Sequence, residues 1–477
     1  MSLLESVKKI RNLNPQTAFL IISLLFGLSF AVITPPFQSP DEIVHFYRAY
    51  EISELHFMPQ KVGNAYGGYL PQSVPVAAYM SSQGVQQNPN IRYNFGVTRA
   101  LLHQQLNPQK TTFVASANSY SPLSYIPQLP GIYIGRILEL PPIIILLLGR
   151  ISDVVFWSIS IYFAIKFIPI GKWSLAILGL TPMAVFLSGS VTIDTMLNAS
   201  AFMLLAYALK VRYSESIKIK DKIVLIILAT CIALVKIVYL PLIAVLFIIT
   251  AKSFGGLWKK ASFISMAVIV PTLFGLGWLK AISPVQAYSV KYTSETVGFQ
   301  LSPTQQENVS LSSPVSYGKV LWNTYLTNNG DHITNEFAGT LGSLDVALPT
   351  YLVTAEYVVV VLVLISEPAT QIIFLRKYKI FLLVSAIFMT IAISSAMYLY
   401  SSPYKYPIIV GLQGRYFIPL SILAIPFLAN LFKGIKISQK SRRSLVFNGS
   451  VIILGLSLIF TAFRYYAFLG RMIAHIH

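Results

Sequence analysis

Long apolar segments recur along the whole chain and are separated by polar stretches. A helix needs about 20 apolar residues to cross a hydrocarbon layer of ~30 Å, and the short alternating segments of an outer-membrane barrel are missing. The pattern therefore predicts an all-α polytopic membrane protein. The first span is expected at about 15–33, before a polar stretch that reaches about Tyr120. Later spans are expected at about 173–190, 192–210, 222–237, 239–251, 261–282, 351–375, 380–400, 414–432 and 445–465.

The segment 122–168 leaves the number of spans open. It must cross the membrane once in net, yet it holds more apolar sequence than one helix needs, and five prolines interrupt it. Three short crossings would give about thirteen spans in all. One crossing with a re-entrant piece would give about eleven, since broken helices are tolerated at membrane depth where they line protein or water. We favour thirteen. No internal repeat is evident, which counts against transporter folds built from inverted halves.

Composition supports the membrane assignment. Only 11% of the 477 residues are charged and 55% are hydrophobic, whereas a soluble domain has about a quarter charged residues. The single cysteine, Cys231, lies within an apolar segment, so neither a disulfide framework nor a thiolate metal site is expected. The apolar run 18–34 is long and lacks a clear cleavage site, which indicates an uncleaved first helix rather than a signal peptide.

The net charge of +19 comes largely from short basic clusters between the apolar segments. Such clusters are typical of cytoplasmic loops under the positive-inside rule, so nucleic acid is not expected as a partner. The rule places 211–221, 252–260, 376–379 and 433–444 inside, together with the N-terminus. Within a single integral membrane domain, 1–477, this leaves two large external loops, 34–120 and 283–350, and a short third loop at 401–413.

The stretch SPDEIVHFYRAY, residues 39–50, concentrates ionisable residues directly after the first span. It fits a helix start, with Ser39 as N-cap, Pro40 at the first helical position and Glu42 completing a capping box. Asp41 in the first turn would complement the helix dipole. This interpretation explains both acids without any chemistry.

A cap does not explain the basic residues that follow. At 100° per residue Asp41, His45 and Arg48 share one narrow stripe, opposite a broad apolar face that includes Phe46 and Tyr50. An amphipathic helix of this kind lies flat at the membrane interface. We therefore expect the stripe to face a water-filled space, where the acids can act chemically.

Further polar residues fall near the predicted external ends of spans. A lysine in apolar sequence is costly at the membrane centre, so Lys236 in ALVKIVYLPL either snorkels to the interface or binds an anion. An arginine fork suits phosphate oxygens, so Arg415 in GLQGRYFIPL either anchors the helix at the interface or binds phosphate. Arg150 could form a structural pair with Asp153. The other candidates at external positions are Asp194, Tyr239, Asp331, His332, Glu336, Asp345, Gln413 and Tyr416.

Several classes of site have no sequence support. The chain has no HExxH or CxxC spacing, no Walker loop and no GxSxG elbow. Cytosolic nucleotide chemistry is therefore unsupported. The sequence assigns no cofactor, and it leaves a requirement for a divalent cation open.

The motifs together resemble a known family. PPFQSPDEIVHFYRAYEIS, SPLSYIPQLPGIYIGRIL, GLTPMAVFLSGSVTIDTML, LGSLDVALP and GLQGRYFIPL occur in order along nearly the full chain. In this it is similar to a bacterial family of predicted membrane proteins of unassigned function, which is grouped with the GT-C glycosyltransferases. The PxDExxHxxRA and QGRY elements are the most specific parts of the match, although Gln38-Ser39 stands where a second proline–acid pattern often occurs.

The resemblance implies a GT-C-like bundle of about 11–13 helices in the bacterial inner membrane, with its active site on the periplasmic face. Such enzymes transfer a sugar from a polyprenyl-phosphate carrier to a cell-envelope glycan or lipid-linked acceptor, using an acid in the first external loop. That acid corresponds to Asp41 or Glu42. A transporter or flippase of lipid-linked saccharides is the alternative. The predicted substrate-binding residues are His45, Arg48, Asp194, Lys236, Tyr239, Glu336, Asp345, Gln413, Arg415 and Tyr416.

Overall fold

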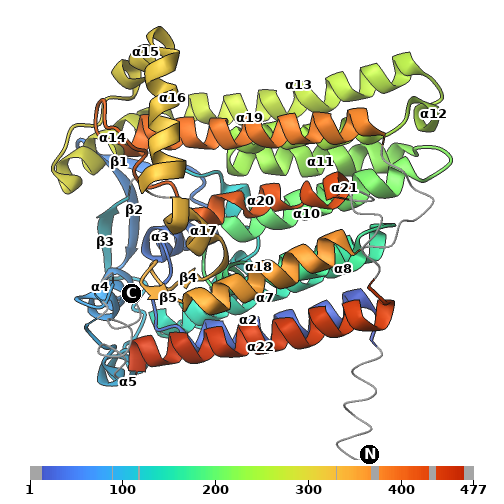
Figure 1. Ribbon diagram of the computed structural model, residues 1–477. Coiled ribbons are helices and arrows are strands. Elements are labelled where there is room, and N and C mark those ends of the chain that lie inside the picture. The colour runs from blue at the N-terminus through green and yellow to red at the C-terminus, as the bar shows by residue number, and fades with distance from the viewer. Residues whose placement is uncertain are drawn as a thin grey trace, which may run out of the picture.

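The computed structural model describes residues 13–86, 88, 90–116, 119–328, 330–366, 375–428 and 437–466. Long helices run side by side and form a bundle, while small strands and short helices gather at one end of it (Figure 1). Five helices in the described residues are long and apolar enough to cross a membrane. They are α2 (Pro15–Ile33), α7 (Pro142–Phe167), α13 (Leu257–Ala281), α19 (Arg376–Ser401) and α22 (Gln439–Tyr466). The prediction of an all-α polytopic membrane protein is confirmed.

Shorter helices fill the bundle between these five, close to the predicted positions. The predicted span at 239–251 is the 3₁₀ helix η2 (Ile237–Ile248) rather than an α-helix, and Pro241 lies inside it. The span predicted at 414–432 begins as separate short helices, and residues 429–432 lie outside the described part of the chain. The bounds are α8 (Lys172–Gly179), α9 (Pro182–Ser188), α10 (Asp194–Arg212), α11 (Ile219–Val235), α18 (Thr350–Ile365), η4 (Gly414–Phe417), α20 (Ile418–Ser421) and α21 (Ala424–Leu428).

The preference for three crossings in 122–168 is wrong. After η1 (Pro122–Tyr125) and the short α6 (Leu129–Ile137), a single helix, α7, runs uninterrupted for 26 residues. Pro141 and Pro142 mark the start of this helix, where proline is favoured because the first N–H groups have no helical partner. α6 packs closely against α7, since a Cβ on Gly131 would lie 2.0 Å from the Leu148 carbonyl oxygen. The region thus matches the alternative of one crossing plus a short broken piece.

The two long polar loops fold over the same end of the bundle, here called the loop end (Figure 1). The first loop holds α3 (Glu42–Ser53) and an antiparallel sheet in the order β1-β2-β3, in which Gly67 of β2 pairs with Ala115 of β3. Basic segments such as α12 (Ala251–Phe254) lie at the opposite end. The remaining elements of the loop end are β1 (Gln60–Val62), β2 (Ala65–Pro71), β3 (Thr111–Ala115), α4 (Ser73–Ser82), α5 (Phe95–Leu102), α14 (Ser283–Val297), α15 (Pro303–Ser312), α16 (Pro314–Trp322), the π-helical η3 (Asn323–Asn328), α17 (Gly330–Ala338), β4 (Thr340–Leu341) and β5 (Val346–Ala347).

Helix α3 is present, but it is not a helix that lies with one face in lipid. It packs against α6, β2 and η1, and its aromatic residues Phe46 and Tyr50 are fully buried. Arg48, on the stripe that was expected to face water, is 1% exposed. The first loop encloses α3, so the helix is a rigid support rather than a membrane anchor.

Candidate active site

Asp41 lies at the junction between α2 and α3. It is the N-cap of α3 and adopts the left-handed conformation, φ 58° and ψ 12°, which Asp tolerates better than most residues. Its carboxylate makes no capping hydrogen bond, and 58% of its side chain is accessible. The predicted cap at Ser39 is wrong, because this residue is buried and its hydroxyl accepts a hydrogen bond from Ser190 Oγ at 2.9 Å. Asp41 is therefore held by backbone geometry, with its carboxylate available for other partners.

Four charged side chains meet at this junction, and we call them the ionic cluster: Asp41, Asp194, Lys236 and Arg415. The two terminal nitrogens of Arg415 bind different acids, Nη2 to Asp41 Oδ2 at 2.7 Å and Nη1 to Asp194 Oδ2 at 3.0 Å. The other oxygen of Asp194 lies 3.5 Å from Lys236 Nζ. The cluster thus joins four predicted site residues from distant parts of the chain.

Each member of the ionic cluster stands at an interruption of a helix. Asp194 is the first residue of α10, Lys236 separates α11 from η2, and Arg415 belongs to η4. Such positions lack regular helical hydrogen bonds, so polar side chains gather there without unwinding a span. Gln413, directly before η4, accepts a hydrogen bond from Arg415 Nε at 2.5 Å and helps to orient the guanidinium.

Aromatic rings enclose the basic side of the ionic cluster. The Lys236 ammonium lies 4.7 Å from the ring centre of Tyr416 and 5.8 Å from that of Tyr120, within the range of a cation–π interaction. The Tyr239 hydroxyl donates to the Tyr416 carbonyl at 2.8 Å and so fixes the loop that carries Arg415. Burial raises the pKa of Tyr120 above its usual value, so this phenol stays neutral.

His45 lies one turn along α3 from Asp41 and is neutral at ordinary pH. Burial, the largest effect, lowers its pKa to about 4, although the charges of Asp41 and Asp194 oppose the shift. Its Nδ1 lies 3.0 Å from the Tyr125 hydroxyl, and its ring lies 5.6 Å from that of Tyr120. A neutral imidazole in this place adds no third positive charge to those of Arg415 and Lys236.

Asp41 stays ionised in the ionic cluster. Burial raises its pKa, but other effects together lower it below the usual 3.8. These are the charge of Arg415, the charge that His45 carries only in acid, the hydrogen bond from Arg415 and the charge of Lys236. Asp41 is therefore a carboxylate at neutral pH, accessible from outside and able to accept a proton from a bound molecule.

Glu42, the adjacent acid, has a structural role in this geometry. It is fully buried and receives two hydrogen bonds from Arg150, from Nε at 2.7 Å and from Nη2 at 2.5 Å, and one from the Val191 N–H at 3.1 Å. Arg150 also donates to carbonyl oxygens where α2 ends, including that of Thr34 at 2.7 Å. Arg150 therefore pairs with Glu42 and not with Asp153. Of the two acids proposed for catalysis, only Asp41 faces open space.

Two further candidates lie outside the ionic cluster. Arg48 pairs with Glu51 at 2.7 Å and donates to the carbonyl of His56 at 3.1 Å, so it closes the end of α3. Asp345 binds Arg464 of α22 at 2.5 Å and fastens the second loop to that helix. Both side chains form buried ion pairs outside the ionic cluster, so the structure gives them structural contacts, and their contact with substrate stays a prediction.

Glu336 acts on the site through the backbone. Its Oε2 accepts a hydrogen bond from the Gly414 N–H at 2.9 Å, and its Oε1 lies 3.3 Å from His332 Nε2. Burial raises the pKa of Glu336 above its usual value. Gly414 lies so close to α17 that a Cβ would come within 2.0 Å of the Ile333 carbonyl oxygen. Helix α17 therefore sets the position of the residue before Arg415.

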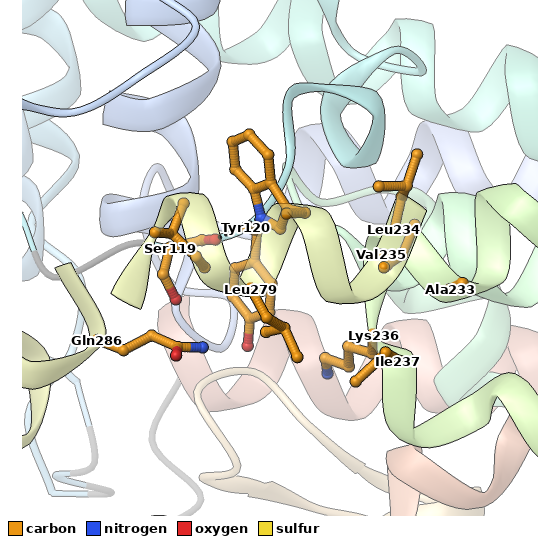
Figure 2. A pocket seen from close by; sticks show the side chains of 12 residues that line it. Ser119, Tyr120, Ala233, Leu234, Val235, Lys236, Ile237, Leu279 and Gln286 are labelled. Carbon is orange, nitrogen blue, oxygen red and sulfur yellow. Dashed lines mark hydrogen bonds between the residues drawn. The ribbon is translucent and has the colours of Figure 1, made fainter. Parts of the chain in front are cut away.

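A recess of about 100 Å³ opens beside Lys236 of the ionic cluster. Figure 2 shows Tyr120, Lys236 and Gln286 on its walls, contributed by the end of the first loop, the α11–η2 junction and α14. The indole of Trp278 on α13 donates to the Ser119 carbonyl at 3.0 Å and closes another side. Sequence reasoning missed Tyr120, Tyr125 and Gln286 as site residues, although Tyr125 lies within the SPLSYIPQL motif. Their roles depend on tertiary contacts that no short motif encodes.

The part of the chain that the structure describes contains no preformed metal site. No group of three or more His, Cys, Asp or Glu side chains there is arranged to hold a metal ion. Asp41 instead binds Arg415, and Asp194 binds both Arg415 and Lys236. We assign no metal ligand.

Comparison with known proteins places the chain in a family but gives no further match. No curated protein and no solved structure matches it. A family model described as predicted membrane protein (DUF2142) matches residues 24–424. This range contains all four residues of the ionic cluster together with the recess beside it. The chain therefore belongs to the DUF2142 family of predicted membrane proteins.

Proposed function

We propose that the protein is a membrane glycosyltransferase of the GT-C type. It would move a sugar from a polyprenyl-phosphate-linked donor to a hydroxyl of a cell-envelope glycan or lipid-linked acceptor. The loop end would face the periplasm or the outside of the cytoplasmic membrane. The observation that carries the proposal is one accessible carboxylate, Asp41, in contact with Arg415 and close to Lys236 at the end of a helical bundle.

The proposed reaction is a single inverting displacement. Asp41 accepts the proton of the acceptor hydroxyl while the hydroxyl oxygen forms a bond to the anomeric carbon of the sugar. The bond between that carbon and the phosphate oxygen breaks, and its electron pair leaves with the polyprenyl phosphate. Arg415 and Lys236 stabilise the charge on the leaving phosphate. His45 would position Asp41 and the acceptor, since it is buried and bound to the Tyr125 hydroxyl.

The recess suits the lipid-bearing side of the donor. Lys236 lies on its wall, where an ammonium can bind phosphate, and α13 contributes Gly275, Trp278 and Leu279. The outer side of α13 carries exposed apolar side chains, among them Leu273 and Phe274. A polyprenyl chain could follow this apolar surface while its phosphate stays near Lys236, so the donor needs no nucleotide site.

A flippase of lipid-linked saccharides is the alternative. It would require polar groups through the depth of its spans, whereas the ionic cluster gathers around Asp41 where α3 begins, at the loop end. Substitution of Asp41 distinguishes the two functions. An Asp41→Asn protein should lose sugar transfer if it is an enzyme and keep carrier translocation if it is a flippase.

The composition of cell-surface polysaccharide tests the proposed function. Cells with the gene, without it and with Asp41→Asn are compared, and Glu54→Gln serves as the control because Glu54 forms a partly exposed pair with Arg136 away from the ionic cluster. The proposal predicts that deletion and Asp41→Asn remove the same glycan component. A glycan profile unchanged by both would contradict it.

A further inference from the structure

The ionic cluster is electrically balanced in the structure. Asp41 and Asp194 contribute two negative charges, and Arg415 and Lys236 contribute two positive charges. The nearby His45 adds none, since its pKa is about 4. Both terminal nitrogens of Arg415 are already bound to carboxylates. A phosphate that approaches the cluster therefore finds no net positive charge, and it must replace one of the acids to bind Arg415.

The two acids differ in how easily they can be replaced. Asp194 is 5% exposed and is bound by both cations, so its removal would take one counter-ion from the buried Arg415 and another from the partly exposed Lys236. The Asp41 side chain is 58% accessible and binds Arg415 only through Nη2. It also stands at the open end of α3 in a non-helical conformation. Asp41 is the exchangeable partner, and Asp194 is the fixed one.

The recess brings a ligand as far as Lys236. Lys236 lies on its wall and also contacts Asp194, the acid that binds Arg415. One carboxylate thus spans the two cations, so a phosphate group of similar size that reaches Lys236 is close to Arg415 as well. Figure 2 shows that the side chains of Lys236 and Tyr120 both line this recess. A phosphate in the recess would therefore meet Lys236 first, whereas the more accessible Asp41 is bound to Arg415.

We propose that the phosphate of the lipid-linked donor displaces Asp41 from Arg415, so that Asp41 becomes a free base only after the donor has bound. The inference rests on the proposed function and adds an order of events to it. Without donor, Asp41 is held as the counter-ion of Arg415 and is a weak base. With donor, the phosphate takes over Arg415, and Asp41 turns to the acceptor hydroxyl with a stronger affinity for its proton. The acceptor is thus activated only when a sugar is in place.

Binding of farnesyl phosphate to the purified protein in detergent tests this exchange by calorimetry. Asp41→Asn removes the competing charge and keeps the left-handed turn, which Asn also tolerates. It should bind farnesyl phosphate about tenfold more tightly than the wild type, because close charge pairs are commonly worth at least a factor of ten. Glu54→Gln should bind like the wild type, and Lys236→Met should lose binding.

The outcomes separate the inference from the proposed function. Equal or weaker binding by Asp41→Asn overturns the exchange but leaves a transferase with a different order of events. Binding that survives Lys236→Met places the ligand elsewhere and also overturns the exchange. If neither the wild type nor Asp41→Asn binds farnesyl phosphate, the donor class of the proposed function is wrong as well.

Discussion

Replacement of Glu42 by Gln distinguishes a structural acid from a catalytic one. Glu42 is fully buried and accepts three hydrogen bonds, two of them from Arg150. A glutamine of the same size offers one oxygen, and its NH₂ group would face a guanidinium nitrogen, donor against donor. Arg150 cannot lose its charge, and it would remain buried without a counter-ion. Removal of one partner from a buried ion pair costs about 3–5 kcal/mol.

Thermal unfolding of the purified protein in detergent measures this cost. We expect Glu42→Gln to unfold at a clearly lower temperature than the wild type, with activity lost in proportion to folded protein. Asp41→Asn should unfold near the wild-type temperature, because the Asp41 side chain is largely accessible, yet it should be inactive. Glu54→Gln should change stability by about 0–1 kcal/mol, since its pair is partly exposed. A Glu42→Gln protein as stable as the wild type but inactive would refute this reasoning and return Glu42 to the chemistry.

Three other perturbations test separate parts of the site. Gly414→Ala should lower the transfer rate about tenfold or more, because the added Cβ would come within 2.0 Å of a backbone oxygen of α17. Gly277→Ala is the control, since no atom lies within 4 Å of its added Cβ, and it should leave the transfer rate unchanged. Lys236→Met should raise KM for the lipid-linked donor more than it lowers kcat, and an unchanged KM in steady-state kinetics would argue against phosphate binding there. Burial raises the pKa of Asp41, but the charges of Arg415, His45 and Lys236 bring it below 3.8. The pH dependence of kcat/KM reports groups of the free enzyme. We therefore expect kcat/KM to stay level at neutral pH and to fall only in acid, where the Asp41 carboxylate is protonated. With a pKa of about 4, His45 should add no step near pH 6.5, and a step there would contradict the assignment of a neutral imidazole.

The hydrophobic pattern was sufficient to predict most of the bundle. The spans at 15–33, 192–210 and 380–400 reappear as α2, α10 and α19 with small shifts of their ends, because about 20 apolar residues must form helix in a membrane. The error at 122–168 came from reading prolines as breaks. Pro141 and Pro142 instead begin α7, a position at which proline disturbs no hydrogen bond.

The candidate site could be predicted only in part. Asp41, Asp194, Lys236 and Arg415 each stood out as a charged residue at the end of an apolar segment, and the structure brings them together. The sequence could not predict which acid pairs with which basic residue. Glu42 and Asp41 are neighbours in the chain, yet they point to different partners because α3 turns Glu42 towards α7, more than a hundred residues away in sequence.

The same limit explains the residues whose roles were misjudged or missed. Helical periodicity placed Arg48 on the stripe of Asp41 and His45, but the first loop folds over that part of α3 and buries it. Tyr120 lies in the site because the end of the first loop packs beside Lys236. Periodicity predicts which side chains share a face, and only tertiary structure decides what covers that face.

Release of polyprenyl phosphate tests the central claim most directly. Membranes from cells that lack the protein would supply both donor and acceptor, and the purified protein would be added in detergent while lipid carriers are followed by mass spectrometry. We predict that the wild-type protein consumes one polyprenyl-phosphate-linked sugar and releases the bare polyprenyl phosphate, while folded Asp41→Asn does neither. If the wild-type protein consumes no lipid-linked sugar, or if Asp41→Asn consumes it equally fast, the assignment of Asp41 as the base of a glycosyltransferase is wrong.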